Sequence, residues 1–249
     1  MMWSDPLPEG KPAPLWHQIA ERLRVAIKQS EFKPGDALPS EARLNQIFGV
    51  SRATSRASLD RLEQEGLIRR RSGVGSIVVV PRVDQPANEM SGFAEDMRRR
   101  GLRPSYDTRF VGRVRVPVEV TEALEINAGS LVFQSRRLLK ADETPIGFAV
   151  SWLSPSLLRG AKLPTRAELS AGSLYEWIFR QFGVRITGAR EFIEAAIVQK
   201  EMATELQVPA GSAVLIVKRV SRGSNGLPVE YAVLHFRADR YRFHLEVVR

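Results

Sequence analysis

The stretch LPSEARLNQIFGVSRATSRASLDRLEQEGLIRRRSGVG, residues 38–75, decides the fold of the N-terminal part of the chain. It predicts a short helix over residues 41–48, because Ser40 is a favoured N-terminal cap and Gly49 a favoured terminator. Ser51 then caps a second helix in the same way. Two helices separated by a tight glycine turn are typical of a helix-turn-helix unit.

Two β-rich segments follow these helices. Residues 67–71 and 76–80 flank the turn Ser72-Gly73-Val74-Gly75, and this arrangement predicts a basic hairpin. A helix-turn-helix followed directly by such a hairpin is a winged helix-turn-helix, a layout that reads double-stranded DNA. We therefore expect the N-terminal domain to bind DNA.

The start of the second helix is the predicted reading element. Its free N–H groups and its dipole favour contact with phosphate. Ser51, Arg52 and Thr54 are therefore well placed to contact DNA. A guanidinium can also bind guanine in a bidentate manner, contributing about 1–3 kcal/mol of base discrimination, and Arg52 and Arg56 share one helix face. The full set of candidate DNA contacts is Ser40, Arg43, Ser51, Arg52, Thr54, Arg56, Arg71 and Gly73.

A purely structural interpretation competes with this one. Taken alone, Arg52 and Arg56 are more often a solvated helix face, and three consecutive arginines are usually surface charge. The order of the features favours DNA binding, because a structural helical pair has no need of a glycine turn, a capped basic helix and a glycine-tipped basic hairpin in succession.

Four separated motifs carry a family resemblance. They are residues 14–19 (PLWHQI), 34–41 (PGDALPSE), 49–56 (GVSRATSR) and 65–68 (EGLI), and together they resemble the GntR family of bacterial transcription regulators. The resemblance implies that the start of the recognition helix contacts operator DNA. It implies the same of the arginine that corresponds to Arg56 and of the wing-tip glycine that corresponds to Gly73. The family often has an arginine where Ala42 stands, and here Arg43 lies one place later.

Length and composition predict two domains. A chain of 249 residues can bury two cores, and the absence of cysteine excludes a disulfide framework and a thiolate metal site. The segment from Pro81 to Ser91 has neither helical nor strand periodicity, which is typical of a linker. We therefore expect a winged helix-turn-helix domain at residues 1–80, a linker at 81–91 and a second domain at 92–249.

The net charge of +9 is spread along the chain. Residues 1–80 contain 12 Lys+Arg and 9 Asp+Glu, which leaves +6 for the remainder. Basicity favours a nucleic-acid partner only weakly here, because it is not confined to the predicted reader. The N-terminus lacks the apolar core of a signal peptide, and no apolar run approaches the roughly 20 residues that span a bilayer. We expect a cytoplasmic protein with no membrane contact.

The second domain contains a partial duplication. Residues 124–133 resemble residues 206–215 at a constant offset, and 145–150 resemble 228–233 with one residue inserted. Each copy predicts a helix, an Ala-Gly-Ser turn and a β-hairpin, and with Tyr241 to Val248 they indicate a mainly antiparallel sheet. A helix over residues 173–182 is expected to cover this sheet, which makes the chain an α+β protein. A cleft where the two copies meet is a candidate ligand pocket.

Two charged residues stand in buried-type strands. Arg137 lies in an apolar strand, and Glu230 alternates with Ala232 and Leu234 on one face. Buried charges either have partners or bind a ligand, so an internal Arg137–Glu230 ion pair and a ligand site are equally good interpretations. By contrast, we expect Arg98 to Arg100 to form a solvated helix end.

A second resemblance covers residues 90–249. The segments 93–97 (FAEDM), 141–145 (ADETP), 173–175 (SLY), 228–231 (PVEY) and 237–243 (RADRYRF) resemble the effector domain of the HutC branch of GntR regulators, the UTRA domain. That domain is similar in fold to chorismate lyase. The resemblance implies a homodimer and a small-molecule site at Phe93, Arg137, Ser173, Tyr175 and Glu230.

Three departures bear on the effector. Members that bind phosphorylated amino sugars have arginine, glutamate and tyrosine where this chain has Leu139, Ala149 and Phe236. Losing a guanidinium removes a bidentate phosphate contact. We therefore expect a smaller or differently charged effector.

The sequence predicts a ligand-responsive transcription regulator, a repressor that binds a near-palindromic operator as a homodimer and needs no cofactor or metal. Two alternatives differ in class. A chorismate-lyase-like enzyme fused to a DNA-binding domain would need a catalytic constellation, yet His17, His235 and His244 are scattered. A purely architectural DNA binder would have no need of the second domain.

Overall fold

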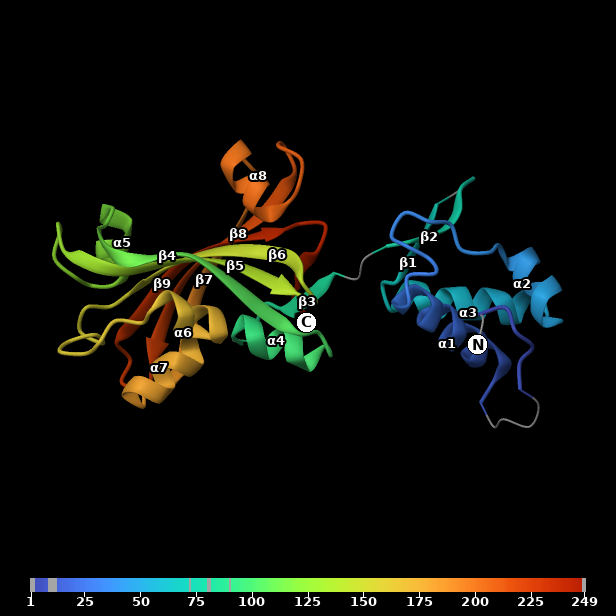
Figure 1. Cartoon of the computed structure of the whole chain (residues 1–249), viewed down its shortest axis with the longest axis horizontal. Coiled ribbons are helices and arrows are strands. Elements are labelled where there is room, and N and C mark those ends of the chain that lie inside the picture. The colour runs from blue at the N-terminus through green and yellow to red at the C-terminus, as the bar shows by residue number, and fades with distance from the viewer. Residues whose placement is uncertain (1–2, 9–12, 72, 80–81, 90, 248–249) are drawn as a thin grey trace. The chain divides into compact units, whose positions relative to one another are not determined.

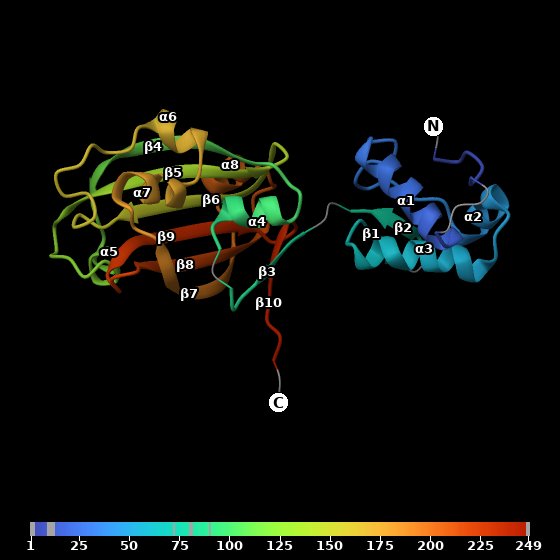
Figure 2. The same ribbon diagram turned by 90° about the horizontal axis from the view of Figure 1, so that it is seen from below.

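The computed structural model describes residues 3–8, 13–71, 73–79, 82–89 and 91–247, and the chain divides into two units, Met1–Arg82 and Val83–Arg249. Five positions named in the expectations above therefore lie outside the described residues: Ser72, Val80, Pro81, Met90 and Val248. Each unit has its own apolar core. Figures 1 and 2 show their elements from two directions. None of the helices in the described part of the chain is long and apolar enough to cross a membrane.

The first unit is three helices and a hairpin. Its elements are α1 (Leu15–Lys28), α2 (Glu41–Phe48), α3 (Arg52–Gln64), β1 (Ile68–Arg71) and β2 (Gly75–Val78), with β1 and β2 antiparallel. The predicted caps are present: Ser40 Oγ accepts the N–H of Arg43, and Ser51 Oγ accepts the N–H of Thr54, each at 3.2 Å. Gly49 ends α2 with φ of 65°, a left-handed conformation that favours glycine. The predicted winged helix-turn-helix is confirmed.

The second unit is built on a six-stranded antiparallel sheet. Its elements are β3 (Val83–Pro86), α4 (Phe93–Arg99), β4 (Pro104–Arg115), α5 (Val118–Ala123), β5 (Leu131–Ala141), β6 (Thr144–Leu153), α6 (Arg166–Ala171), α7 (Leu174–Phe182), β7 (Ile186–Ile197), α8 (Lys200–Leu206), β8 (Ala213–Gly223), β9 (Pro228–Arg237) and β10 (Tyr241–His244). The strand order is β4-β5-β6-β9-β8-β7. This arrangement confirms the predicted α+β class.

The sheet shows that the duplication is larger than the sequence motifs indicate. The offset between residues 124–133 and residues 206–215 also relates β4 to β7. Pro104 and Arg115, the ends of β4, correspond to Ile186 and Ile197, the ends of β7. The offset relates β5 to β8 in the same way. The two halves meet where β6 pairs with β9, with Val150 opposite Val233. A pseudo-two-fold axis therefore passes through the centre of the sheet.

Helices cover both faces of this sheet (Figure 1). Helices α4, α6 and α7 lie on one face, where Met97, Leu169 and Ile178 are fully buried against the strands. Helices α5 and α8 cover the other face and bury Leu124 and Leu206. The face under α4 and α7 holds the predicted effector residues.

The C-terminal segment differs from the prediction. We expected the segment from Tyr241 onward to extend the main sheet, but β10 instead pairs in parallel with β3, at residues 83–86, to form a separate two-stranded sheet. The expected linker segment thus contains a strand. Val83, 2% exposed, and Tyr241, 3% exposed, pack into the core beside α4. Each short strand has a single buried apolar anchor, which leaves no apolar periodicity to detect.

A glycine at the centre of the sheet generates a stability prediction. A Cβ on Gly147 would lie 2.7 Å from Phe236 Cδ1 and 3.0 Å from the His235 carbonyl oxygen, whereas a Cβ on Gly188 would meet no atom within 4 Å. We expect Gly147→Ala to lower the free energy of unfolding by about 1–3 kcal/mol through overpacking. Gly188→Ala should change it by less than about 0.5 kcal/mol. Urea unfolding of both variants measures the difference, and equal midpoints would contradict the prediction.

Candidate DNA-binding and effector-binding sites

The predicted DNA-contacting residues lie on one unit and are accessible. Thr54 is half-buried, and the other seven are exposed in the free protein: Ser40, Arg43, Ser51, Arg52, Arg56, Arg71 and Gly73. Arg52 and Ser51 stand at the N-terminus of α3, where backbone N–H groups attract phosphate. Gly73 has φ of 75° and open space around it, so the hairpin tip can approach a groove closely.

Arg56 is preorganised by a carboxylate. Its Nε donates to Glu41 Oε1 at 3.1 Å and its Nη2 to Glu41 Oε2 at 3.5 Å, while its side chain remains 65% exposed. The paired Glu41 raises the pKa of Arg56 through the hydrogen bond. An ion pair this exposed contributes little to the stability of the fold, but Glu41 can orient the Arg56 guanidinium on the DNA-reading face.

The three consecutive arginines divide into different roles. Arg70 turns back onto α3, where it pairs with Asp60 at 2.8 Å and donates to the Arg56 carbonyl at 3.2 Å. Arg69 and Arg71 are exposed on the hairpin. Arg70 therefore supports the position of α3, and Arg71 at the base of the turn remains available for DNA.

The five predicted effector residues come together in the second unit. Phe93, Arg137, Ser173, Tyr175 and Glu230 all line one hollow over the middle of the sheet. The hollow encloses about 410 Å³ of space between atoms, part of which is open to solvent. Strands β5 and β9 supply the two charged side chains, and the N-terminal ends of α4 and α7 supply the others.

Glu230 is 3% exposed and is held by hydroxyl donors. The Tyr175 hydroxyl donates to Glu230 Oε2 at 2.9 Å, and Ser221 Oγ donates to the same oxygen at 3.3 Å. Burial raises the pKa of Tyr175 far above its ordinary value. The Tyr175 hydroxyl is therefore a permanent donor. Because both contacts fall on Oε2, the other carboxylate oxygen of Glu230 can accept from a ligand.

Arg137 lies in the same hollow with donors unused. It is 6% exposed, and its Nε and Nη1 atoms are buried and have no hydrogen-bond partner among the described residues. Its guanidinium stacks over Tyr106, with Cζ 5.0 Å from the ring centroid. Burial lowers the pKa of Arg137, while the nearby Tyr106 and Glu230 act in the opposite direction. With two of its nitrogens unpaired, Arg137 does not form the closed internal ion pair with Glu230 that was one of the two interpretations.

Arg219 is a lining residue that we did not predict. Its Nε donates to Glu191 Oε1 at 2.5 Å, so its charge is already paired, in contrast with Arg137. The sequence repeat could have identified Arg219, because Arg219 occupies in the second copy the position that Arg137 occupies in the first. Two arginines thus approach the hollow from symmetry-related strands, one paired and one with open donors.

The residues noted as departures occupy different places. Leu139 and Ala149 line the hollow and make its floor apolar. Phe236 is 2% exposed and stacks on Tyr241, with ring centroids 4.0 Å apart. The first two can therefore act directly on ligand choice, while Phe236 belongs to the core beside the hollow.

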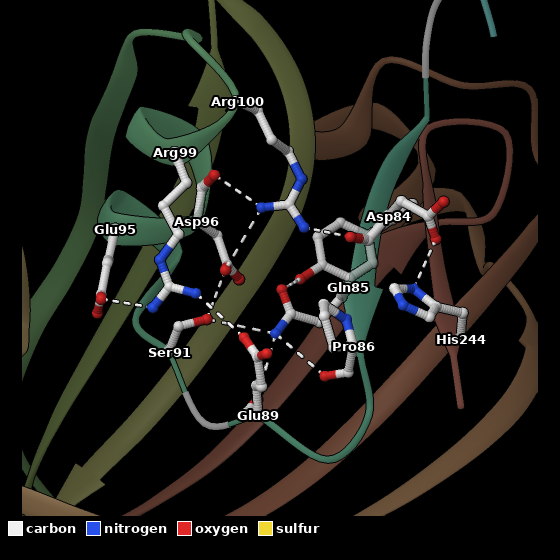
Figure 3. Close-up of polar contacts among 11 residues, drawn as sticks. Asp84, Gln85, Pro86, Glu89, Ser91, Glu95, Asp96, Arg99, Arg100 and His244 are labelled. Carbon is white, nitrogen blue, oxygen red and sulfur yellow. Dashed lines mark hydrogen bonds and ion pairs between the residues drawn. The ribbon is translucent and has the colours of Figure 1, made fainter. Parts of the chain in front are cut away.

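A polar network connects α4 to β3 (Figure 3). Asp96, 3% exposed, accepts a hydrogen bond from Ser91 Oγ, and Ser91 in turn accepts one from Gln85 Nε2 at 3.3 Å. Arg100 donates to the Asp96 carbonyl at 2.7 Å and to the Asp84 carbonyl. Our expectation that Arg100 is solvated is wrong, because it joins the helix that begins at the hollow to the strand that begins the second unit.

Comparisons with known proteins identify two domain families in the chain. The sequence model of the bacterial regulatory proteins of the gntR family matches residues 15–78, and that of the UTRA domain matches residues 99–242. The HTH-type transcriptional repressor NagR of Bacillus subtilis is 31% identical over 232 residues, which cover 93% of this chain and 94% of that protein. The HTH-type transcriptional regulator GgaR of Escherichia coli is 30% identical over 94% of this chain and 91% of that protein.

A solved structure shares the fold. The crystal structure of PhnF from Mycobacterium smegmatis superposes with a TM-score of 0.76 at 23% identity, over 92% of this chain and 98% of that one. The relatives named above are transcriptional regulators and not enzymes. The chain therefore belongs to the GntR family of transcription regulators, in the HutC-like group that joins a winged helix-turn-helix to a UTRA domain.

Proposed function

We propose that this regulator is a cytoplasmic repressor whose operator affinity is controlled by a small anionic metabolite in the hollow of the second unit. The observation that carries the proposal is Arg137, a buried guanidinium with open donors. A cation buried without a partner is costly, and a bound anion would supply the missing acceptor. The relative named as a repressor supports the sign of regulation.

The chemistry of the hollow defines the effector class. Arg137 offers N–H donors, and Glu230 offers an acceptor oxygen within the same space. A carboxylate or phosphonate at Arg137 with a hydroxyl or ammonium group toward Glu230 would satisfy both. Leu139 and Ala149 leave room for a short apolar portion between these groups and add no further charge. An amino-sugar phosphate fits this site poorly.

The route from effector to DNA follows the network of Figure 3. Phe93 lines the hollow and begins α4. Asp96 on this helix accepts from Ser91, and Arg100, which caps the helix, donates to the Asp84 carbonyl. An effector that shifts α4 would therefore shift β3, which follows the DNA-binding unit directly in the chain. The coupling cannot exceed the difference between the effector's affinities for the two states. A homodimer would present two such readers to a near-palindromic operator.

The central test combines operator binding with an effector screen. Gel-shift titration on DNA from the protein's own promoter should give a specific complex, and a thermal-shift screen of short carboxylates, amino acids and phosphonates should raise the melting temperature for one class. That class should also release the operator. A complete absence of specific DNA binding would contradict the proposal, as would an effector that binds without changing operator affinity.

Replacing an arginine on the DNA-reading face of α3 by alanine should weaken specific binding to the operator. We expect Arg52→Ala and Arg56→Ala each to cost about 1–3 kcal/mol of operator binding, a loss of about 5-fold to 150-fold, because a bidentate base contact disappears. Arg61→Ala is the matched control, since Arg61 lies on the same helix but pairs with Glu65 at 2.7 Å. Fluorescence anisotropy at fixed salt measures all three. Full affinity in both test variants would show that these arginines do not read the operator.

Replacing Arg137 and replacing Arg219 should change the stability of the protein in opposite directions. Arg137→Met should raise the stability of the ligand-free protein by about 1–4 kcal/mol, because a buried charge with open donors is replaced by an apolar chain. Arg219→Met should lower stability by on the order of 2 kcal/mol, since it strands the partly buried Glu191. Urea unfolding checks both signs. Destabilisation by Arg137→Met would show that its guanidinium is already satisfied in the free protein.

The network between α4 and β3 should carry the response. Arg100→Gln removes the guanidinium that joins Asp96 to the Asp84 carbonyl. With the effector class found in the screen, we expect unchanged effector binding but a smaller change in operator affinity, within the roughly 5-fold to 150-fold range of ordinary coupling. Arg103→Gln is the control, because Arg103 is exposed and pairs at the surface with Asp142. Equal coupling in both variants would exclude this route.

A further inference from the structure

Two helices flank the hollow of the second unit, and the duplication relates them to each other. The offset of the repeat relates Phe93, the first residue of α4, to Tyr175 of α7, and both residues line the hollow. Figures 1 and 2 show the two helices on the same face of the sheet. The hollow thus has the sheet as its floor and the first turns of α4 and α7 as its walls.

An ion pair joins the two walls. Arg98 Nη1 on α4 lies 2.7 Å from Glu176 Oε1 on α7, and the two side chains are 56% and 47% exposed. Burial raises the pKa of Tyr106, which lines the hollow, and among the nearby charges Glu176 raises this pKa further while Arg98 lowers it. Both charges are therefore close to the hollow and open to solvent. The ion pair lies at the rim, between the two helices.

This ion pair breaks the symmetry of the repeat. The offset relates Arg98 to Arg180 and Ala94 to Glu176. Arg180 is exposed and makes no ion pair with any residue that the structure describes, although its Nε donates to the Glu176 carbonyl at 3.4 Å. Ala94 has no carboxylate to offer it. The contact between Arg98 and Glu176 therefore depends on these two side chains and does not follow from the fold of each copy.

Helix α4 is the less firmly anchored wall. It has seven residues and buries two apolar side chains, Ala94 and Met97. Helix α7 has nine residues and buries three, Leu174, Trp177 and Ile178. Elements with fewer buried apolar contacts open at a lower cost in free energy. A movement of α4 away from α7 would separate the ion pair and widen the hollow.

We propose that Arg98 and Glu176 form a latch across the rim of the hollow. When closed, the latch holds α4 against α7, and its opening admits or releases the effector. This inference rests on the proposed function, because it takes the hollow as the effector site. An exposed ion pair suits the role, since it changes an equilibrium by at most about five-fold and is readily opened. The latch would control the rate of effector exchange, while groups on the floor control affinity.

A thiol inside the hollow measures how often the latch opens, because the chain contains no cysteine of its own. Ser151 lines the hollow and is 2% exposed. In full-length Ser151→Cys, the rate of alkylation by iodoacetamide follows the open fraction when reclosing is fast. Iodoacetamide is uncharged, so a change of charge at the rim neither attracts nor repels it. Mass spectrometry follows the reaction, and Ala149→Cys on the same floor is the reporter if Ser151→Cys does not fold.

Removing either partner of the latch should speed this reaction. In the Ser151→Cys background, we expect Arg98→Gln and Glu176→Gln each to raise the alkylation rate by about 2-fold to 5-fold, which is the range of an exposed ion pair. Arg180→Gln is the matched control, because it removes the symmetry-related arginine, and it should leave the rate unchanged. Far-UV circular dichroism confirms that each variant is folded. An unchanged rate in both latch variants would overturn the proposal.

Exchanging the two charges provides an independent test. Arg98→Glu combined with Glu176→Arg restores the ion pair with reversed sign, so this double variant should return the alkylation rate to that of Ser151→Cys alone. Raising the salt concentration from about 0.05 M to about 0.5 M should speed the reaction when the latch is intact, because salt screens exposed charges, but not in Glu176→Gln. A double variant that reacts as fast as the single variants would overturn the latch.

These measurements use neither effector nor operator, so the latch and the proposed function can fail separately. If the latch variants behave as expected but no metabolite raises the melting temperature, the role of the hollow as an effector site is overturned and the ion pair still controls access to it. If an effector binds and releases the operator while the alkylation rate is indifferent to Arg98 and Glu176, only the latch is overturned.

Discussion

The pairing of β6 with β9 is the contact on which the second unit depends. It joins two copies of one helix-and-hairpin unit into a single sheet, with Val150 opposite Val233 near the centre. Because β5 and β8 flank this pair, Arg137 and Arg219 approach the same space from opposite sides. The helices α4 and α7 then close that space from above, so one hollow forms where the halves meet. The site follows from the duplication and needs no separate element.

The first unit could be predicted from the sequence almost entirely, since its signals are local. Caps at Ser40 and Ser51 and the turn at Gly49 act within a few residues, and all three are present. The five effector residues were also brought together as expected, although that expectation rested on a family resemblance and not on periodicity. What periodicity alone left open was whether Arg137 and Glu230 pair.

The parts that could not be predicted depend on long-range contacts. Strand β3 begins the second unit and is paired with β10, which lies near the other end of that unit in sequence, and each strand has a single buried apolar anchor. Arg100 looks like a solvated residue in a run of arginines, and only the folded chain brings the Asp84 carbonyl to it. Arg219 could in principle have been predicted from the offset of the repeat. A repeat identifies equivalent positions, however, and does not show in which copy the role of the residue has changed.

Function in such a duplicated domain requires that the symmetry be broken. Arg219 is paired with Glu191, whereas Arg137 keeps open donors, so the unpaired N–H groups of the two arginines lie at one end of the hollow. Glu230 corresponds to Gly147 in the other half, where a side chain would collide with Phe236, so the hollow has one acceptor end as well. The edges have diverged in the same manner, since a bulge and α6 block β4 while β7 stays open.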